Sequence, residues 1–435
     1  MVDVTKGERT IQEIVRQNLC IGCGTCAVLC PKNALKIVEC PETGTYQPQL
    51  DDSKCNRCGI CLKTCPGIEA DFNKLNLITF DQRLKYPFVG NFLKCYSGHA
   101  TDQSVRFKST SGGLIPALAM FALEIGLADG VLTTRANPEK PLRPHSFVAR
   151  TKEEVMSAVG SKYCPVPANS ALDDILENQG RYIVVGLPCH VQGVRKAQAL
   201  NKELKDRIPL VFGIVCNHAP TFHAIAYLLK KCKIPEDKIA KLEYRSKGWP
   251  GGINITMDDC SEHFIPFNSS YYWGYVFQKF FWSKRCMICN DKLCLLADII
   301  FMDAWLPEFS SDKIGSSLIV VRSKNGADLI AKAMEKGIVE LSPVPIEAVL
   351  RSQILSKTIA RVAARRLALK YSSNRLSTSE ILSPNPSVFD LLEAFHLVFI
   401  NRICKNPSKI SDTVIEYHKN VWDLARFAKR MVKRA

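Results

Sequence analysis

The chain has 435 residues, of which 46% are hydrophobic, with 19 cysteines and a formal net charge of +16. Its length predicts two or three domains with a sizeable core. So many cysteines would indicate disulfides in a small secreted protein. Here residues 1–15 contain acidic side chains and lack the apolar core of a signal peptide. We therefore expect a cytoplasmic protein with metal-bound and free thiols.

The most apolar stretch is residues 114–132. It carries Pro116, Glu124 and Asp129, so it predicts a buried helix that leads into a strand rather than a membrane span. The large positive charge attracts anions, whether nucleic acid, anionic lipid, an acidic protein or a polyanionic small molecule. Charge alone does not choose among these partners.

The first predicted unit, residues 1–80, contains two cysteine runs with one spacing. Each run has the pattern Cys-x2-Cys-x2-Cys-x3-Cys-Pro, and the second repeats the first after 35 residues. Bacterial-type ferredoxins bind two 4Fe–4S clusters with this pattern, and the fourth cysteine of each run binds the other cluster. We therefore predict an α+β, ferredoxin-like module. One cluster would be bound by Cys20, Cys23, Cys26 and Cys65, and the other by Cys55, Cys58, Cys61 and Cys30.

Glycines and prolines within these runs fit the same interpretation. Gly22, Gly24 and Gly59 would let the backbone approach the cluster sulfides, and Pro31 and Pro66 would turn the chain away after the fourth ligand. The competing interpretations are a pair of zinc sites or a disulfide framework. Zinc usually takes four ligands as two spaced pairs, so two three-plus-one runs favour clusters.

Short strands at 36–38 and 45–48 are predicted in the module, followed by a linker around residues 87–90. In residues 92–345, segments with the pattern of a strand then alternate with segments with the pattern of a helix. The predicted strands are Gly130–Thr134, Arg181–Gly186, Pro209–Val215, Asp298–Met302 and Ser316–Val321; the predicted helices are Gly113–Ile125, Lys152–Val159, Val191–Leu200, Thr221–Lys231 and Gly326–Lys336. This alternation predicts an α/β core with a mainly parallel sheet.

Residues 346–435 are predicted to form a helical, basic C-terminal extension. Residues 346–370 have the pattern of one helix with a basic face, and the Ser-, Asn- and Pro-rich stretch 371–388 that of a linker. Residues 411–434 have the period of an amphipathic helix and end in basic residues. Most such helices pack on their own domain; the alternative is contact with a membrane surface or a partner.

A third group of cysteines lies in the core. Cys189 and Cys216 follow predicted strands, and Cys286 and Cys289 form a Cys-x2-Cys pair. Strand ends meet at the carboxyl edge of a parallel sheet, where such folds build their sites. On spacing alone, however, four scattered cysteines are more often ordinary buried residues.

Five motifs in a fixed order carry a family resemblance. They are Ser111-Gly112-Gly113, Gly160-Ser161-Lys162-Tyr163, Gly186-Leu187-Pro188-Cys189, Lys247-Gly248-Trp249-Pro250-Gly251, and Cys286-x2-Cys289 followed by Ala297-Asp298-Ile299 and Asp303-Ala304-Trp305. In this order they resemble the beta subunits of coenzyme F420 hydrogenases and dehydrogenases, over about residues 15–350. The family also includes a formate dehydrogenase beta subunit and the plant 7-hydroxymethyl chlorophyll a reductase.

The resemblance implies a flavin-binding α/β core with its own 4Fe–4S cluster. Its ligands would be Cys189, Cys216, Cys286 and Cys289, with Cys294 as a competing ligand or a spare cysteine. This chain departs from the commoner family pattern at two positions, where Leu187 replaces a threonine and Met302 replaces a glycine.

The Ser109-Thr110-Ser111-Gly112-Gly113 loop opens a predicted helix. Hydroxyls and amides at a helix N-terminus suit a flavin pyrophosphate or ring, although without the resemblance a helix cap would be the better explanation. With the resemblance we assign this loop to a flavin, FAD in preference to FMN. Lys162 would then offset charge on a phosphate or at flavin N1, and the alternative is an exposed lysine. The loop 247–252 is either a mobile basic loop near the substrate or a surface turn.

These inferences predict an iron–sulfur flavoprotein that exchanges a hydride with coenzyme F420 or a similar carrier. Single electrons would pass through the clusters to a redox partner protein or ferredoxin, because a flavin accepts a hydride and releases electrons singly. The phosphate and glutamate tail of F420 would be drawn to a basic surface. No catalytic side chain is predicted, because a hydride step needs alignment rather than an acid–base pair.

Three alternatives remain: a ferredoxin-linked reductase of another organic substrate, a non-catalytic electron-relay subunit, and a basic nucleic-acid-binding protein. The last predicts aromatic residues interleaved with Lys and Arg, or a recognisable reading helix, and the sequence has neither.

Overall fold

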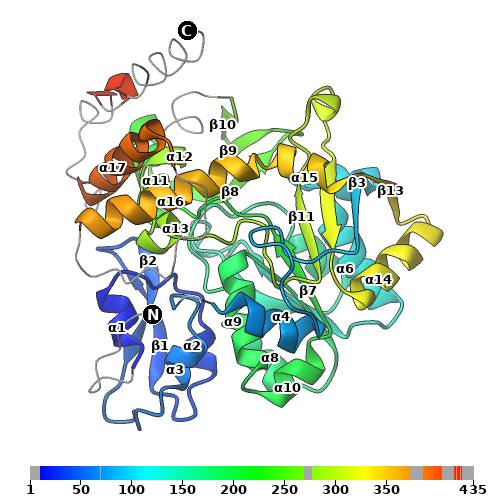
Figure 1. Cartoon of the computed structure of the whole chain (residues 1–435). Coiled ribbons are helices and arrows are strands. Elements are labelled where there is room, and N and C mark those ends of the chain that lie inside the picture. The colour runs from blue at the N-terminus through cyan, green and yellow to red at the C-terminus, as the bar shows by residue number, and fades with distance from the viewer. Residues whose placement is uncertain are drawn as a thin grey trace.

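The computed structural model describes residues 10–68, 70–268, 277–372, 386–403, 416–417, 419–421 and 423. Figure 1 shows a small N-terminal module at the lower left, a larger α/β core at the right, and C-terminal helices above the module.

The N-terminal module is a hairpin with three short helices: α1 (Gln12–Arg16), α2 (Thr25–Val28), β1 (Leu35–Cys40), β2 (Thr45–Leu50) and α3 (Ile60–Lys63). Strands β1 and β2 pair antiparallel and include the strands predicted at 36–38 and 45–48. Helices α2 and α3 each begin after a glycine with positive φ, Gly24 at 93° and Gly59 at 75°. A side chain is rarely tolerated in that region, so both halves of the duplicated motif need glycine there.

The core is built on one eight-stranded sheet with the strand order β13-β3-β12-β11-β7-β6-β4-β5. The strands are β3 (Lys94–Ala100), β4 (Gly130–Arg135), β5 (His145–Ala149), β6 (Tyr182–Gly186), β7 (Leu210–Ile214), β11 (Ile299–Asp303), β12 (Ser317–Val321) and β13 (Val339–Pro343). All five strands predicted from the sequence are present.

The prediction of a mainly parallel sheet is wrong, because the sheet is mixed. Only the four central strands β4, β6, β7 and β11 pair in parallel. Strands β5, β12, β3 and β13 pair antiparallel with their neighbours. The reason lies in the connections: β4 to β5 and β11 to β12 are joined without a crossover helix of the kind that parallel strands require.

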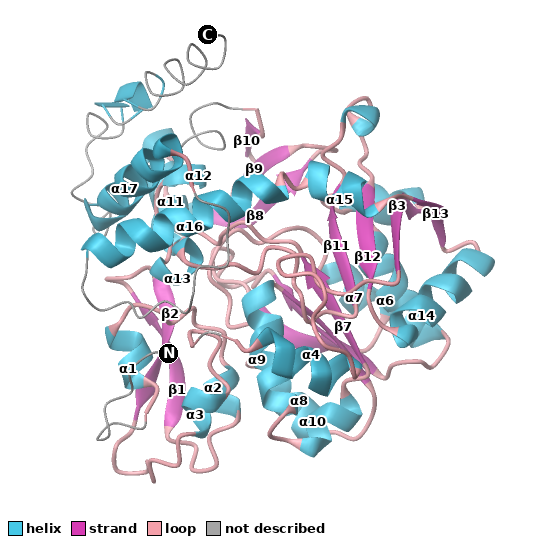
Figure 2. Ribbon diagram, in the orientation of Figure 1, coloured by secondary structure: helices cyan, strands magenta, loops and turns pink. Residues whose placement is uncertain are grey.

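Helices cover both faces of the sheet, as Figure 2 shows. One face packs against α6 (Leu114–Glu124), α7 (Lys152–Ser157) and α14 (Lys324–Glu335). The other packs against α4 (Phe72–Phe80), α8 (Leu172–Glu177), α9 (Pro188–Gln198), α10 (Lys202–Arg207) and α15 (Ile346–Ser352). Alternation along β6 explains this, since Ile183 and Val185 face the first group and Val184 the second.

A smaller antiparallel sheet of β8 (Ile239–Ser246), β9 (Gly252–Met257) and β10 (Glu262–Pro266) packs with α11 (Phe222–Cys232). The sequence prediction contained the helix but not this sheet. The remaining short elements of the core are α5 (Gln103–Lys108), η1 (Glu236–Lys238), α12 (Phe277–Lys279), α13 (Lys284–Met287) and η3 (Pro307–Phe309).

The single helix predicted over 346–370 is in fact two, α15 and α16 (Leu355–Ser372). The break falls at Ile354, whose φ of 48° ends a right-handed helix. A further helix, α17 (Val388–Ile403), begins where a linker was predicted to end. Most of the helix predicted over 411–434 lies outside the described residues. In the part of the chain that the structure describes, no helix is long and apolar enough to cross a membrane.

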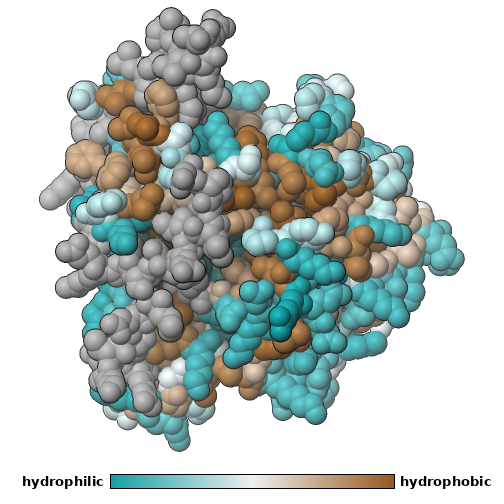
Figure 3. Space-filling model, in the orientation of Figure 1, coloured by the Kyte–Doolittle hydropathy of each residue, from teal (hydrophilic) through white to brown (hydrophobic). Residues whose placement is uncertain are grey.

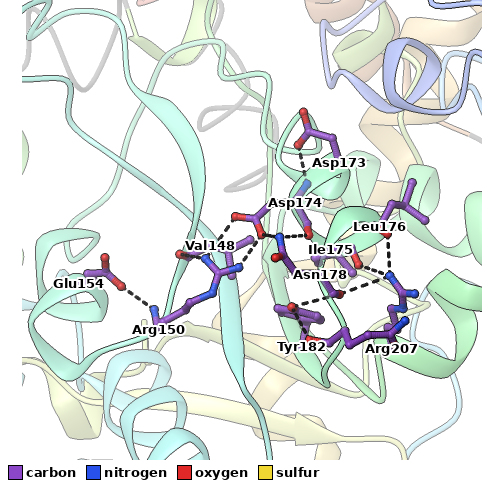
Figure 4. Close-up of polar contacts among 11 residues, drawn as sticks. Val148, Arg150, Glu154, Asp173, Asp174, Ile175, Leu176, Asn178, Tyr182 and Arg207 are labelled. Carbon is purple, nitrogen blue, oxygen red and sulfur yellow. Dashed lines mark hydrogen bonds and ion pairs between the residues drawn. The ribbon is translucent and has the colours of Figure 1, made fainter.

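Figure 3 shows apolar surface over α17, where Val388, Leu392 and Phe395 are exposed. In the same view the surface at the lower right is mainly hydrophilic. Figure 4 shows polar contacts among the end of β5, α8 and α10: Arg150, after β5, pairs with Asp174 of α8, and Arg207 of α10 donates to the Ile175 carbonyl. These contacts fix α8 and α10 at the β5 edge of the sheet.

Candidate functional site

Four cysteines surround a first cavity in the N-terminal module. Its lining includes Cys20, Cys23, Cys26 and Cys65, the first set predicted from the sequence. Cys23, Cys26 and Cys65 are buried. Gly22 has a positive φ of 68°, and a Cβ there would lie 2.5 Å from the Tyr46 carbonyl oxygen of β2. The hairpin therefore closes over this cavity only because residue 22 has no side chain.

The other four cysteines of the two runs surround a second cavity. Its lining includes Cys30, Cys55, Cys58 and Cys61. Here Cys58 is exposed and the other three are half-buried. In both cavities the fourth cysteine comes from the other run, as the crossed pattern of a two-cluster ferredoxin requires.

The pKa values of the cysteines that line the first cavity show that their charged form is unstable there without a bound cation. Burial raises the pKa of Cys65 to about 11, and the neighbouring Cys23 adds to this while Lys196 opposes it. Burial and the surrounding cysteines raise the pKa of Cys26 well above its usual value. Three buried thiolates beside the half-buried Cys20 are unstable together unless bound cations offset their charge, so the donor set of the first cavity fits an iron–sulfur cluster.

The cysteines do not converge as ligands of one ion do. Within the described residues, no group of three or more His, Cys, Asp or Glu side chains is arranged to hold a single metal ion. Each cysteine of a cubane binds a different iron, so its ligands surround a volume instead of meeting at a point.

The third group of cysteines comes together in the core. Burial raises the pKa of Cys189, and Cys216, Cys286 and Cys289 are its next strongest influences. Cys189 opens α9 directly after β6, and Cys216 follows β7. The loop after α13 brings Cys289 to the same edge of the sheet. The structure therefore unites the four residues that the resemblance named.

Cys294, the competing ligand, is fully buried behind this group. It packs against Gly213 of β7, where a Cβ would lie 2.6 Å from its Sγ. Its neighbours are the apolar side chains of the sheet face that α9 covers. Its charge also helps to raise the pKa of Cys216, after burial, Cys286 and Cys289, so both interpretations of Cys294, a competing ligand and a spare cysteine, stay predictions.

A buried ion pair holds the core group in place. Arg195 of α9 lies 2.7 Å from Asp298, which also accepts a hydrogen bond from the Val211 amide at 2.7 Å. The pair joins the helix that carries Cys189 to β7, the strand that leads to Cys216. The motif Ala297-Asp298-Ile299 thus has a structural role that the sequence did not reveal.

The module docks on the core by contacts that the sequence prediction missed. Asn169 donates from its backbone to the Cys23 carbonyl at 2.8 Å and from its side chain to Thr25 at 2.8 Å. Lys196 donates to the Cys65 carbonyl at 2.7 Å, and Arg285 to the Pro66 carbonyl at 3.0 Å. These residues are far apart in the chain, so no local pattern could have identified them. The first cavity consequently faces the core.

His190, next to Cys189, is buried, and burial lowers its pKa to about 4. Its backbone carbonyl accepts a hydrogen bond from Asn169 at 2.9 Å. The neutral ring and this contact support a structural role.

The loop 109–113 lies against the start of β12. Ser111 donates to the Ser316 carbonyl at 2.8 Å, and the Gly112 amide donates to Ser317 at 3.0 Å. Ser109 donates to Val105 of α5, and Thr110 contacts Ser161 at 2.9 Å. Both glycines have structural reasons: a Cβ on Gly112 would lie 2.7 Å from the Gly98 carbonyl oxygen, and Gly113, the residue before α6, has a φ of 73°.

Lys162 is close to this loop through the Thr110–Ser161 contact. Its ammonium donates to the carbonyls of Gly160 at 2.8 Å and of Ala158 at the end of α7. Burial lowers the pKa of Lys162 to about 8. The exposed lysine considered from the sequence is therefore not what the structure has.

The most informative residue missed by sequence reasoning is Arg245, which is buried beneath the loop. It donates to the Thr110 carbonyl at 3.1 Å and forms an ion pair with Asp303 at 2.9 Å. Burial opposes its charge, but Asp303 outweighs this and raises the pKa of Arg245. Arg245 precedes the 247–251 motif and Asp303 is the last residue of β11, so two of the five motifs meet at the loop.

Aromatic rings cover this ion pair. Trp249 and Trp305 have ring centroids 4.7 Å apart, and Phe267 stacks on Trp305. A Cβ on Gly315 would lie 3.1 Å from both Ser111 and Trp249. Gly315 therefore lies in close contact with both the 109–113 loop and the 247–251 loop. Lys247 of the same motif does not join this group; its ammonium forms an ion pair with Glu262 of β10 at 2.7 Å.

Two buried polar atoms beside the loop have no hydrogen-bond partner among the residues that the structure describes: the Trp249 indole Nε1 and the Ser246 hydroxyl. Such atoms are costly unless a ligand or water satisfies them. With the half-buried hydroxyls of Ser109, Thr110 and Ser111, they fit a polar, ring-containing ligand such as a flavin.

A chain with a two-cluster cysteine module docked on an α/β core that gathers four more cysteines is an iron–sulfur protein of the electron-transferring type. Residues 19–67 match the 4Fe-4S dicluster domain. Residues 95–173 and 179–347 match the N-terminal and C-terminal parts of the coenzyme F420 hydrogenase/dehydrogenase beta subunit. The chain belongs to this oxidoreductase family.

Individual proteins with similar sequences have names that agree with this family. The coenzyme F420 hydrogenase subunit beta of Methanosarcina barkeri is 25% identical over 265 residues, covering 59% of this chain and 84% of that protein. In Methanosarcina mazei, one subunit that belongs to the F(420)H(2) dehydrogenase is 24% identical over 353 residues, covering 75% and 91%.

One solved structure has a similar fold. A chain of the F420-reducing [NiFe] hydrogenase complex from Methanosarcina barkeri superposes with a TM-score of 0.53 at 23% identity, covering 67% of this chain and 96% of that one.

Proposed function

We propose that this chain is an iron–sulfur flavoprotein that exchanges a hydride with coenzyme F420, or a similar carrier, and delivers single electrons to a protein partner. The flavin, FAD in this proposal, would be held by Ser109, Thr110, Ser111 and Lys162. A bound flavin accepts electrons as a hydride and releases them singly, and bound 4Fe–4S clusters pass them one at a time.

The observation that carries the proposal is the position of the first cavity between the other two cysteine groups. Cys23, which lines this cavity, is among the residues whose charge raises the pKa of Cys189 in the core. Cys26, on the same cavity, is influenced in the same way by Cys61 of the second cavity. Together with the hydrogen bonds by which Asn169 and Lys196 of the core bind the backbone of Cys23 and Cys65, these influences support a series of three groups from the core to the exposed Cys58.

The chain's own residues would prepare the hydride step by position and by exclusion of water. Arg245 and Asp303 fix the backbone of the 109–113 loop from below. Trp249, Trp305 and Phe267 lie beside it and shield the ion pair from water. Hydride transfer depends on such alignment, so this rigid support is what the protein contributes.

The choice of coenzyme F420 rests on the names of the relatives and on charge. Relatives from Methanosarcina barkeri and Methanosarcina mazei are subunits that belong to a coenzyme F420 hydrogenase and to an F(420)H(2) dehydrogenase. A net charge of +16 favours a polyanionic carrier and an acidic redox partner.

Anaerobic purification with metal and flavin analysis tests the proposal. We expect about twelve iron atoms and one flavin per chain, since each of three cubanes holds four irons. In stopped-flow mixing, reduced F420 should bleach the flavin band first and the cluster absorbance afterwards. A chain that holds iron without flavin is instead an electron relay, and one reduced faster by a nicotinamide than by F420 uses another carrier.

A matched pair of cysteine variants tests the core group. Cys286→Ala should remove about four irons and stop electron flow from flavin to the module. Cys232→Ala, an exposed cysteine at the end of α11, should do neither. Full iron content in Cys286→Ala would show that the core group binds no cluster.

A further inference from the structure

Helices α16 and α17 lie beyond the residues that match the family, which end at residue 347. Within the described chain they nevertheless pack against the segment that carries Cys286 and Cys289. The apolar contact consists of Met287, between the two cysteines, with Ala364, Ala368 and Leu369 of α16 and with side chains of α17.

Two arginines of α16 bind the backbone of the Cys-x2-Cys loop directly. Arg365 donates from Nε to the Met287 carbonyl at 3.1 Å, and Arg366 donates from Nε to the Ile288 carbonyl at 3.0 Å. Met287 and Ile288 are the two residues between the cysteines. The conformation of the loop is therefore fixed from the C-terminal helices.

Further contacts hold the approach to this loop. Asn401 of α17 accepts a hydrogen bond from the Trp282 amide at 2.8 Å, and Glu393 of α17 pairs with Lys279 at 2.8 Å. The Arg365 guanidinium lies 5.0 Å from the centre of the Trp282 ring. Helices α16 and α17 thus contact residues 279–288 near both ends of this segment.

The position of the Arg365 charge matters as much as its hydrogen bond. Arg365 is only 8% exposed, so solvent screens its charge weakly. Burial lowers its pKa to about 10, and Cys286 and Cys289 are among the groups that act on it in the opposite sense. A positive charge thus persists beside these two cysteines at neutral pH.

We propose that α16 and α17 are a built-in cover of the core cysteine group, and that Arg365 is a positioning residue that raises the reduction potential of the cluster bound there. This inference rests on the proposed function, because it needs a cluster at Cys189, Cys216, Cys286 and Cys289. Reduction adds negative charge to a cluster, and a nearby buried cation stabilises the reduced form. The cover would favour electron acceptance from the flavin.

Redox titration of the full-length chain, monitored by electron paramagnetic resonance, tests the proposal. The core signal is identified as the one lost in Cys286→Ala. Arg365→Gln keeps a hydrogen-bond donor and removes the charge. It should make reduction of the core cluster about tenfold less favourable, which is ~59 mV for one electron. The two module clusters should keep their potentials.

Two further variants complete the test. Lys370→Gln removes an exposed charge from the same helix and should leave all three potentials unchanged. Arg365→Lys keeps the charge and should shift the core potential much less than Arg365→Gln. A core potential unchanged in Arg365→Gln, with iron retained, overturns the proposal.

Loss of iron from the core cysteine group means different things in the arginine variants and in the native chain. If Arg365→Gln loses that iron, Arg365→Lys decides alone: a near-native potential supports the charge effect, and loss of its iron too overturns it. If the native chain itself holds only about eight irons, the proposed core cluster fails and this inference fails with it, whatever the arginine variants do.

Discussion

The two cavities of the N-terminal module are built from the same cysteine spacing but have different surroundings. In the first, Cys23, Cys26 and Cys65 are buried, and Asn169 and Lys196 of the core contact its backbone. In the second, the cysteines are half-buried or exposed. A duplicated sequence therefore gives two similar ligand sets, and docking on the core makes them unequal. We infer that the first cavity serves transfer inside the protein and the second serves exchange with a partner.

The largest effect is expected from breaking the first cavity. Cys23→Ala should lower electron transfer from reduced F420 to an external acceptor by at least ~100-fold, beyond the ~10–100-fold typical of losing a supporting contact. Cys58→Ala should also slow steady-state transfer, but the core and first clusters should still be reduced in a single turnover. Stopped-flow absorbance separates the two variants. Equal single-turnover behaviour would contradict the serial order.

A smaller effect is expected from separating the module and the core without touching a cysteine. A Cβ on Gly193 of α9 would lie 2.6 Å from the Thr25 hydroxyl and 3.0 Å from the Asn169 amide. Gly193→Ala should therefore cost ~1–3 kcal/mol of unfolding free energy, as overpacking does.

Denaturant unfolding monitored by circular dichroism measures that cost. The control is the double variant Gly193→Ala with Thr25→Ala, because removing the hydroxyl relieves the closer contact. The double variant should be more stable than the sum of the single variants predicts. Strict additivity would show that the two residues do not meet in solution.

The smallest effect is expected at the edge of the same interface. Arg143 binds Glu39 of β1 with two hydrogen bonds of 2.7 and 2.8 Å and lies over the Phe222 ring. Because the pair is partly exposed, Arg143→Gln should cost only ~0.2–1 kcal/mol, less at high salt. Lys152→Gln breaks an exposed pair with Glu124 away from the module and is the matched control. A cost above that range would mean that the edge, and not the buried glycine contacts, holds the module.

Much of the site could be predicted because its information is local. The short, regular spacing of each run places three cysteines around one cavity, and the crossed pattern of two-cluster ferredoxins assigns the fourth. The central strands were predictable because they are continuous apolar runs, such as Tyr182–Gly186, buried on both faces. The strand Lys94–Ala100, which lies between β12 and β13, was missed because it mixes polar and small residues. Arg245 was missed because its partners, Thr110 and Asp303, are distant in sequence, and the core cysteines needed a family resemblance to be grouped.

The crossed ligand sets have a consequence for biosynthesis. The first cavity needs Cys65 and the second needs Cys61, so neither is complete until the second run has been made. The core group needs Cys289, which follows roughly 10–50 s later at ~5–20 residues per second. All eight cysteines of the module are therefore made long before the core set is complete. We expect iron delivery to the proposed clusters to follow the same order, with the core set available only when Cys289, which precedes β11, has been made.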